Sequence, residues 1–443
     1  MSDFSSPSAS SADYSSSRFV RVPGMVNAHS HAFHRVLRGR THERSAATAP
    51  AAGAQATVSH ATDNFWTWRE QMYAAASYLS PQAYQQLATA VFAEMVVSGW
   101  TAVGEFHYVH RGRATAKPGS ALSEPLAMEE ALIRAAHAAG IRMTLLDTCY
   151  LQGGLSASGD VIPLNDVQAR FSDGTASGWL ARRALLGELV SSLNASLTPS
   201  SPLVTLGAAV HSVRAVPRAE LDRIRAELKP GAILHAHVSE QPAENESCMA
   251  AYGMTPVELL ASAGLLSPTF SAVHATHLTP QDIALLGSHQ CTVVMCPTTE
   301  GDLADGIGPA RELFDAGATI ALGTDQHASI DPYLEMRQLE HGERLLTGQR
   351  GRFRPSELQA AAVGGGLKSL GLTDVADDYV LVDRESVRTV GSRVEQLPLS
   401  ATAADVRQVV IDGRVVAENG EHASLGSVDE LYRAFLTDNP EFQ

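Results

Sequence analysis

Several histidine and acidic residues have the types and spacing of a metal site. His29 and His31 alternate along the chain, so on an extended strand both imidazoles project from the same side. His237 and Asp325 add a third imidazole and a carboxylate. This donor set suits Zn²⁺ or Fe²⁺, with water at the remaining position. The HxH pair alone also fits two surface histidines, so the hypothesis depends on where the four residues stand among the elements.

Glu240 and His274 have the chemistry to move protons beside such a metal. Glu240 follows His237 by three residues, and a carboxylate there could carry protons between a metal-activated water and a leaving nitrogen. His274 could orient or deprotonate the same water. Considered singly, Glu240 also fits a solvated loop residue, and His274 also fits a hydrogen-bonded core histidine.

Eight short apolar segments recur between residues 25 and 325, and each has the near-continuous apolar character of a parallel strand buried on both faces. Helical patterns lie between most of them, as in residues 124–139 and 217–228. Eight strand–helix repeats predict a fold of the α/β class, a closed (β/α)8 barrel of the TIM type. An open doubly wound sheet is the alternative, and the absence of a GxGxxG motif after the first segment weakens it. The eight segments are MVNAHSH (25–31), TAVGEFHYV (101–109), RMTLLDTCY (142–150), LVTLGAAVH (203–211), AILHAHVSE (232–240), SAVHATHL (271–278), CTVVMC (291–296) and ATIALGTD (318–325).

The predicted barrel would bring the candidate residues together. The carboxyl ends of its parallel strands form one face, and that face carries the catalytic residues. His29, His31, His237, His274 and Asp325 all stand at or near such ends. The fourth segment contains no lysine, the residue that often bridges two metal ions in barrel hydrolases once it is carbamylated. Its absence predicts a single metal ion.

The sequence pattern changes after residue 372. Residues 379–383 and 406–411 predict strands, and residues 428–437 predict a closing helix. Near the other end, residues 67–70 have capping-box spacing, which predicts a helix from there through Tyr78. The predicted division is a disordered serine-rich tail (1–18), the barrel (19–371), a small, reduced β-sandwich domain (372–425) and a C-terminal helix and tail (426–443), with a low-complexity loop at 45–62.

Composition narrows the class of protein. Apolar residues make up 44% of the 443 residues and charged residues 18%, which excludes a disordered, collagen-like or coiled-coil chain. The net charge of −15 disfavours nucleic acid and anionic membranes as partners. No apolar run is long enough to span a membrane, and the N-terminus lacks the features of a signal peptide. The four cysteines form no CxxC pair, which suits a reducing compartment, so we expect a cytoplasmic location.

The ordered set of motifs resembles the amidohydrolase superfamily, in its mononuclear deaminase branch. Over roughly residues 19–425 the chain is similar to the formimidoylglutamate deiminases. Those enzymes convert N-formimino-L-glutamate and water to N-formyl-L-glutamate and ammonia in histidine degradation. The matching motifs are PGMVNAHSHAFHR (23–35), FWTWREQMY (65–73), GEFHYVH (104–110), HSVRAV (211–216), HVSEQ (237–241), VHATHLT (273–279), CPTTEGDLADGIGP (296–309) and GTD (323–325).

The resemblance implies roles for particular residues. It implies one divalent metal ion per subunit, most readily Zn²⁺ with Fe²⁺ as the alternative, and a homodimer. The substrate would be a small dicarboxylate amidine, and guanidinium groups suit its carboxylates. Other deaminases of the branch, acting on a related amidine or on rings such as guanine or imidazolonepropionate, and a catalytically inactive barrel used for binding, are the alternatives. The implied metal ligands are His29, His31, His237 and Asp325, the implied catalytic residues are Glu240, His274 and Asp325, and the implied substrate contacts are Arg69, Tyr108, His211 and Arg214.

Two features depart from the family pattern. His34 stands where the family usually has glutamine, at a position expected to contact substrate. Only about six residues, Phe19 to Gly24, separate the serine-rich tail from the first barrel strand, whereas relatives begin with several strands. We therefore expect an altered amidine contact and a reduced β domain.

Overall fold

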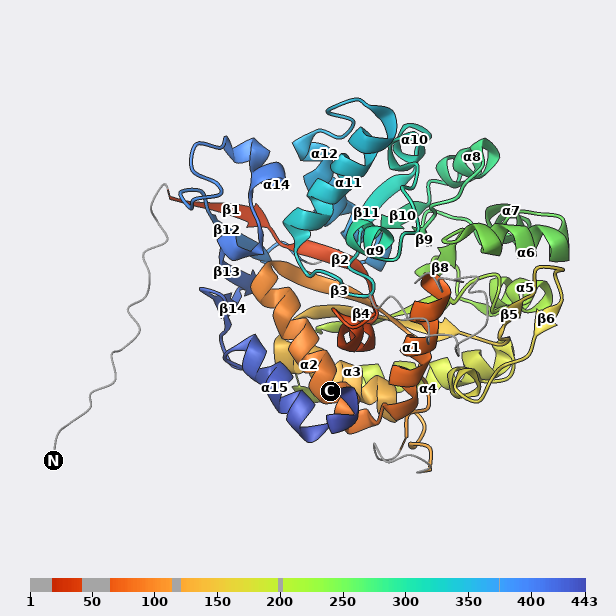
Figure 1. The fold of residues 1–443 in the computed structure, drawn as a ribbon. Helices are drawn as coiled ribbons and strands as arrows, with labels where there is room; N and C mark the ends of the chain where they lie inside the picture. The colour runs from red at the N-terminus through yellow and green to blue at the C-terminus, as the bar shows by residue number, and fades with distance from the viewer. Residues whose placement is uncertain (1–17, 42–63, 114–120, 198–201, 374) are drawn as a thin grey trace, which may run out of the picture.

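The computed structural model describes residues 18–41, 64–113, 121–197, 202–373 and 375–443, and its centre is a parallel sheet (Figure 1). All eight predicted segments form strands of this sheet. A bridge between Ser30 and Asp325 joins the end of the last strand to the first, so the sheet forms a (β/α)8 barrel, as predicted. In sheet order the strands are β2 (Met25–Ser30), β3 (Trp100–His107), β4 (Arg142–Cys149), β7 (Val204–Val210), β8 (Leu234–Val238), β9 (Phe270–His274), β10 (Thr292–Met295) and β11 (Thr319–Leu322).

Helices surround the barrel (Figure 1) and bury the outer faces of its strands. Every residue of β2, β3 and β4 is buried, which explains why these strands show no alternation of polar and apolar residues. The helices are α1 (Phe65–Tyr78), α2 (Pro81–Ser98), α3 (Ala127–Ala139), α4 (Ala176–Leu197), α5 (Arg218–Glu227), α6 (Pro242–Tyr252), α7 (Pro256–Ser262), α8 (Pro280–Ser288), α9 (Pro297–Asp302), α10 (Ala310–Asp315), α11 (Pro332–Thr347), α12 (Pro355–Ala360), α13 (Gly366–Leu370), α14 (Leu397–Ser400) and α15 (Val428–Asp438), with short 3-10 or π turns η1 (Ala32–Leu37), η2 (Gln168–Phe171), η3 (Ala361–Gly365), η4 (Val394–Gln396), η5 (Ala403–Asp405) and η6 (Pro440–Phe442).

Helix α1 begins earlier than its predicted start at Thr67. Asn64 is the N-cap, and its side chain accepts hydrogen bonds from the backbone amides of Trp66 and Thr67. The hydroxyl of Thr67 accepts in turn from the amide of Asn64, so Thr67 occupies the N3 position of the capping box. Asparagine caps a helix as well as threonine does. The capping box therefore spans residues 64–67, three residues before its predicted position at 67–70. As a consequence, Phe65 and Trp66 belong to the same helix as Arg69.

The small domain is a five-stranded antiparallel sheet that combines both ends of the chain. Strand β1 (Phe19–Pro23) pairs with β12 (Tyr379–Asp383), although the sequence-based division assigns residues 19–23 to the barrel. Among the described residues this domain has one sheet layer, so the predicted reduced β-sandwich is a single sheet. The order β1-β12-β13-β14-β15 is completed by β13 (Val406–Ile411), β14 (Arg414–Glu418) and β15 (Glu421–His422), and a separate hairpin joins β5 (Gly154–Leu155) to β6 (Val161–Ile162).

The C-terminal helix α15 is tied to the segment that follows β2. The hydroxyl of Tyr432 donates to Glu94 of α2 at 2.6 Å. Arg35 of η1 and Arg38, which directly follows η1, bind the same carboxylate at 3.1 and 2.7 Å. Burial would raise the pKa of Glu94, but the two guanidinium groups outweigh it and lower that pKa. Glu94 therefore links α2, η1 and α15 through one half-buried charge.

Some predictions concern residues beyond the described ranges. Residues 1–17 of the predicted disordered tail and the predicted loop at 45–62 lie there. Within the described ranges, no helix combines the length and the apolar character needed to cross a membrane.

Candidate active site

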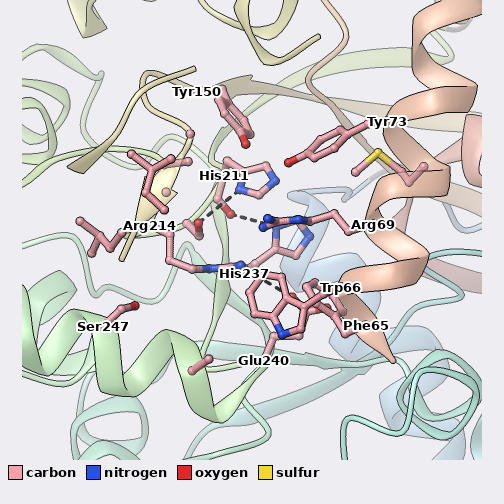
Figure 2. A pocket seen from close by; sticks show the side chains of 18 of the residues that line it. Phe65, Trp66, Arg69, Tyr73, Tyr150, His211, Arg214, His237, Glu240 and Ser247 are labelled. Carbon is pink, nitrogen blue, oxygen red and sulfur yellow. Dashed lines mark hydrogen bonds and ion pairs between the residues drawn. The ribbon is translucent and has the colours of Figure 1, made fainter. Parts of the chain in front are cut away.

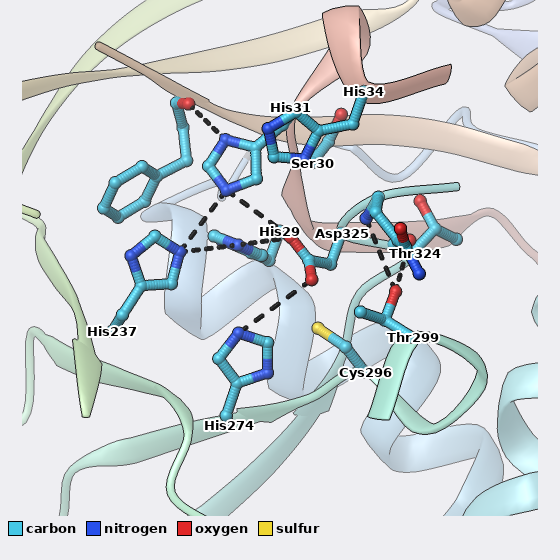
Figure 3. Close-up of polar contacts among 12 residues, drawn as sticks. His29, Ser30, His31, His34, His237, His274, Cys296, Thr299, Thr324 and Asp325 are labelled. Carbon is cyan, nitrogen blue, oxygen red and sulfur yellow. Dashed lines mark hydrogen bonds and ion pairs between the residues drawn. The ribbon is translucent and has the colours of Figure 1, made fainter. Parts of the chain in front are cut away.

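The four predicted metal ligands meet at the carboxyl end of the barrel (Figure 3). Nε2 of His237 lies 3.2 Å from Nε2 of His29 and 3.3 Å from Nε2 of His31. Oδ1 of Asp325 lies 3.3 Å from Nε2 of His29 and 3.4 Å from Nε2 of His31. Tetrahedral ligand atoms about 2.0–2.1 Å from a zinc ion lie roughly 3.3 Å from one another. The spacing of these four atoms therefore suits a small divalent ion.

Hydrogen bonds to main-chain carbonyls determine which ring nitrogens carry lone pairs. Nδ1 of His31 donates to the carbonyl of Phe106 at 2.8 Å, and Nδ1 of His237 donates to the carbonyl of His211 at 2.9 Å. Burial lowers the pKa of His31 to about 3 and that of His237 well below its usual value, so both rings are neutral. Each Nε2 then presents a lone pair, and two lone pairs 3.3 Å apart repel unless a cation lies between them. The donor set thus fits a divalent metal ion.

Glu240, His274 and Asp325 lie close to one another beside these ligands. Nε2 of His274 lies 3.7 Å from Oε1 of Glu240 and 3.9 Å from Oδ2 of Asp325. Burial raises the pKa of Glu240, although His274 and Arg214 oppose the shift. Burial would lower the pKa of His274, but the carboxylates of Glu240, Glu300 and Asp325 outweigh it and raise that pKa to about 10. Imidazole and carboxylate groups at these separations can act as general acid and base in hydrolysis.

The backbone at two of these residues is strained. His274 and Asp325 have positive φ angles of 66° and 41°, a left-handed conformation that non-glycine residues rarely adopt. Such a conformation costs about 1–3 kcal/mol per residue and persists only where the surrounding structure enforces it. At these strand ends it aims both side chains at the centre of the barrel face.

A buried network beneath the ligands holds the two loops that carry them. The hydroxyl of Ser30, which stands between His29 and His31, donates to Glu105 at 2.6 Å, and the amide of Ala32 donates to the same carboxylate at 2.7 Å. Asn27 and Thr324 exchange two hydrogen bonds at 2.6 and 3.0 Å. The loop after β2 and the loop that contains Asp325 are therefore fixed relative to each other.

A cavity of about 400 Å³ opens over this centre (Figure 2). Its lining includes His31, His237, Glu240, His274 and Asp325. The structure places every predicted substrate contact on the same cavity wall, namely His34, Arg69, Tyr108, His211 and Arg214. Residues from both halves of the barrel thus surround one space.

The two arginines on the cavity wall have different surroundings. Among the described residues Arg69 forms no ion pair, and its half-buried guanidinium lies over the rings of Trp66 and Tyr73, 4.5 and 5.6 Å from their centroids. Arg214 lies 3.6 Å from a carboxylate oxygen of Glu240 and 3.6 Å from one of Glu244. Arg69 is therefore a cation available to an anionic ligand, whereas Arg214 already balances two glutamates.

His34 lies between a predicted metal ligand and a predicted substrate contact. Its Nε2 is 3.0 Å from the hydroxyl of Tyr108, and its ring packs 4.5 Å from the ring of His31. Burial lowers the pKa of His34 well below its usual value, so the ring is neutral. A neutral imidazole offers one donor and one acceptor, and a glutamine amide likewise offers both kinds of group.

Sequence reasoning missed several polar residues around this site. Two of them had a helical-spacing signal, because Glu244 follows Glu240 by four residues and Tyr73 follows Arg69 by four. Glu105 interrupts an otherwise apolar segment, which is a signal for a buried carboxylate with a specific role. The missed residues that contact the site or its supports are Tyr73, Glu105, Tyr150, Gln168, Glu244 and Glu300.

The chain belongs to the amidohydrolase family, whose model matches residues 20–416. It is 32% identical over 419 residues to a formimidoylglutamate deiminase from Pseudomonas aeruginosa, a match that covers 91% of this chain and 85% of the relative. The resemblance stated from the sequence motifs is thereby confirmed. An 8-oxoguanine deaminase from the same species is 27% identical over 438 residues, covering 95% of this chain and 88% of the relative.

Solved structures support the same fold. An amidohydrolase from Brucella melitensis superimposes with a TM-score of 0.80 at 29% identity, covering 96% of this chain and 90% of the other. An adenosine deaminase from Xanthomonas campestris gives a TM-score of 0.75 at 21% identity, covering 96% and 85%. The family and these relatives define a hydrolase of the deaminase type, in a superfamily that typically depends on metal ions.

Proposed function

We propose that the protein hydrolyses N-formimino-L-glutamate to N-formyl-L-glutamate and ammonia, as in histidine degradation. The observation that carries the proposal is Arg69, a half-buried guanidinium on the cavity wall with no ion-pair partner in the described parts of the chain. A cation held in this way favours a carboxylate-bearing substrate over a neutral ring. The similarity to the Pseudomonas aeruginosa deiminase supports the amidine as the reacting group.

His29, His31, His237 and Asp325 would hold one divalent ion, for which we propose zinc. When bound, such an ion supplies the Lewis acidity that makes water nucleophilic near neutral pH. The carbonyls of Phe106 and His211 keep two of the imidazoles in the tautomer that presents a lone pair.

Glu240, His274 and Asp325 would move the protons of the reaction. The water oxygen bonds to the formimino carbon, and the bond from that carbon to the imino nitrogen breaks. The two protons that water loses pass through these three side chains to the imino nitrogen, which leaves as ammonia. Glu240 suits the final donation, because burial raises the pKa of its carboxyl group and favours the protonated form.

The cavity wall would orient the substrate. Arg69 would bind one carboxylate, while Tyr108, His211 and Arg214 would lie along the rest of the molecule. His34 would contact the amidine with its imidazole, in the place where the family usually has a glutamine amide. Holding the substrate at both ends keeps the formimino carbon near the water. This lowers the entropic part of the activation free energy of the reaction.

Ammonia release by the zinc-loaded protein tests this proposal. The substrates are N-formimino-L-glutamate, N-formimino-L-aspartate and guanine. We expect strong turnover of the glutamate compound alone. Turnover of guanine with none of either formimino compound would refute the proposal and assign the site to a ring substrate.

A further inference from the structure

Two tyrosines on the cavity wall, Tyr73 and Tyr150, are joined by the side-chain amide of Gln168, which lies behind them. Nε2 of Gln168 lies 2.9 Å from the hydroxyl oxygen of Tyr73 and 2.9 Å from that of Tyr150. Tyr73 belongs to α1, Tyr150 follows β4, and Gln168 begins η2. All three side chains are buried. Within the described part of the chain, none of them hydrogen-bonds a predicted metal ligand.

The direction of these hydrogen bonds follows from the other end of the amide. Oε1 of Gln168 accepts the backbone N–H of Asn165 at 3.0 Å, which places the nitrogen on the side of the two tyrosines. The same nitrogen also lies 3.2 Å from the carbonyl oxygen of Gly153, so its two protons are shared among three acceptors. An amide nitrogen only donates, so neither phenol can donate its proton to it. The phenol protons must then point away from Gln168. Tyr150 also interacts with the hydroxyl of Tyr73, and a chain of two hydroxyls still ends in one unshared proton.

These protons are near the cation that has no ion-pair partner among the described residues. Arg69 and Tyr73 lie four residues apart on α1 and so share a helix face. Figure 2 shows the hydroxyls of Tyr73 and Tyr150 turned toward each other, close to His211 and Arg69. Burial raises the pKa of Tyr150, so its hydroxyl keeps its proton. A guanidinium beside hydroxyl donors is a donor set for a carboxylate.

We propose that Gln168 is a positioning residue that holds the hydroxyls of Tyr73 and Tyr150 so that the one proton left unshared by the pair points into the cavity, where it binds a substrate carboxylate together with Arg69. The identity of the substrate rests on the proposed function, but the ligand chemistry does not. Gln168 touches no reacting atom and acts only through the two hydroxyls.

Three variants test the proposal. Tyr73→Phe and Tyr150→Phe each remove one hydroxyl. Gln168→Glu keeps the size of the side chain but replaces the donor by an acceptor, so the tyrosine protons turn toward residue 168. Tyr333→Phe is the matched control, because Tyr333 is equally buried, lies outside this cavity, and its hydroxyl has no hydrogen-bond partner among the described residues.

Two measurements are made on the zinc-loaded protein. Calorimetry gives the Kd of N-formyl-L-glutamate and of glutarate, which needs no turnover. Kinetics give kcat and KM for N-formimino-L-glutamate and for its two monoamides, which lack either the α- or the γ-carboxylate. We expect the three variants to raise Kd and KM about ten- to one-hundred-fold, with kcat within about twofold of wild type. The increase in KM should vanish for one monoamide, the one that lacks the carboxylate bound here.

The outcomes separate this proposal from the proposed function. If the variants lose affinity for glutarate while the wild type turns over no formimino compound, the carboxylate subsite stands and the proposed function fails. If the wild type hydrolyses N-formimino-L-glutamate but both phenylalanine variants bind glutarate like Tyr333→Phe, the subsite is refuted. Equal KM increases for both monoamides would also refute it, because a merely structural defect has no preference for one carboxylate.

Discussion

Separate replacement of Arg69 and Arg214 by methionine tests how the two cavity cations are used. Arg69 has no ion-pair partner among the described residues, so Arg69→Met removes no internal ion pair and should leave the free energy of unfolding nearly unchanged. A two-point guanidinium–carboxylate contact with substrate is worth about 3 kcal/mol, at about 1.5 kcal/mol for each charged hydrogen bond. We therefore expect kcat/KM for N-formimino-L-glutamate to fall about 150-fold, mainly through KM.

Arg214→Met should behave differently, because it leaves Glu240 and Glu244 without their shared cation. Removing one partner of a buried ion pair costs about 3–5 kcal/mol, and the 3.6 Å separations place this case near the lower value. The pKa of Glu240 should rise further, since Arg214 is one of the groups that hold it down. We expect a lower free energy of unfolding together with a lower kcat.

Urea denaturation and steady-state ammonia release, measured on both variants and the wild type, separate the two cases. The reasoning is refuted if Arg69→Met keeps the wild-type KM. It is also refuted if the two variants lose the same amount of stability, because the structure gives only Arg214 an internal counter-charge.

Three further predictions concern Glu240, the metal site and the ion-paired Glu94. Glu240→Gln should retain the metal ion but lose at least several hundred-fold in turnover, and full activity would contradict its assigned role. Dialysis against a chelator should abolish turnover and lower the unfolding temperature, because an ion that binds only the folded state stabilises it; an unchanged unfolding temperature would argue against the metal site. Arg35 and Arg38 lower the pKa of Glu94, so its contribution to stability is present above its unfolded-state pKa and is lost as the pH falls through the folded-state value. Glu94→Gln should therefore be about 2 kcal/mol less stable than wild type at pH 7, and this difference should shrink steadily as the pH falls through the acid range. A pH-independent difference in urea denaturation would count against the charge as the cause.

The elements could be predicted because their signals are local. Buried parallel strands require continuous apolar segments, and α3 ends at Gly140, whose left-handed φ of 61° suits glycine. The predicted start of α1 is wrong because Asn64 and Thr67 both fit a capping box, and the sequence does not rank them. The placement of β1 in the small sheet could not be predicted either, since its partner β12 lies at the other end of the chain.

By itself, the sequence determined the barrel, the family, and the strand ends at which the candidate ligands and proton-transfer residues stand, because strand periodicity and motif spacing are properties of short segments. Only the tertiary structure decided which cation is paired and which polar side chains support the site. Gln168 binds Tyr73 across 95 residues and Ser30 binds Glu105 across 75 residues, and no local pattern encodes such contacts. They exist because closure of the barrel brings the carboxyl ends of all eight strands to one face, where buried polar groups must find partners.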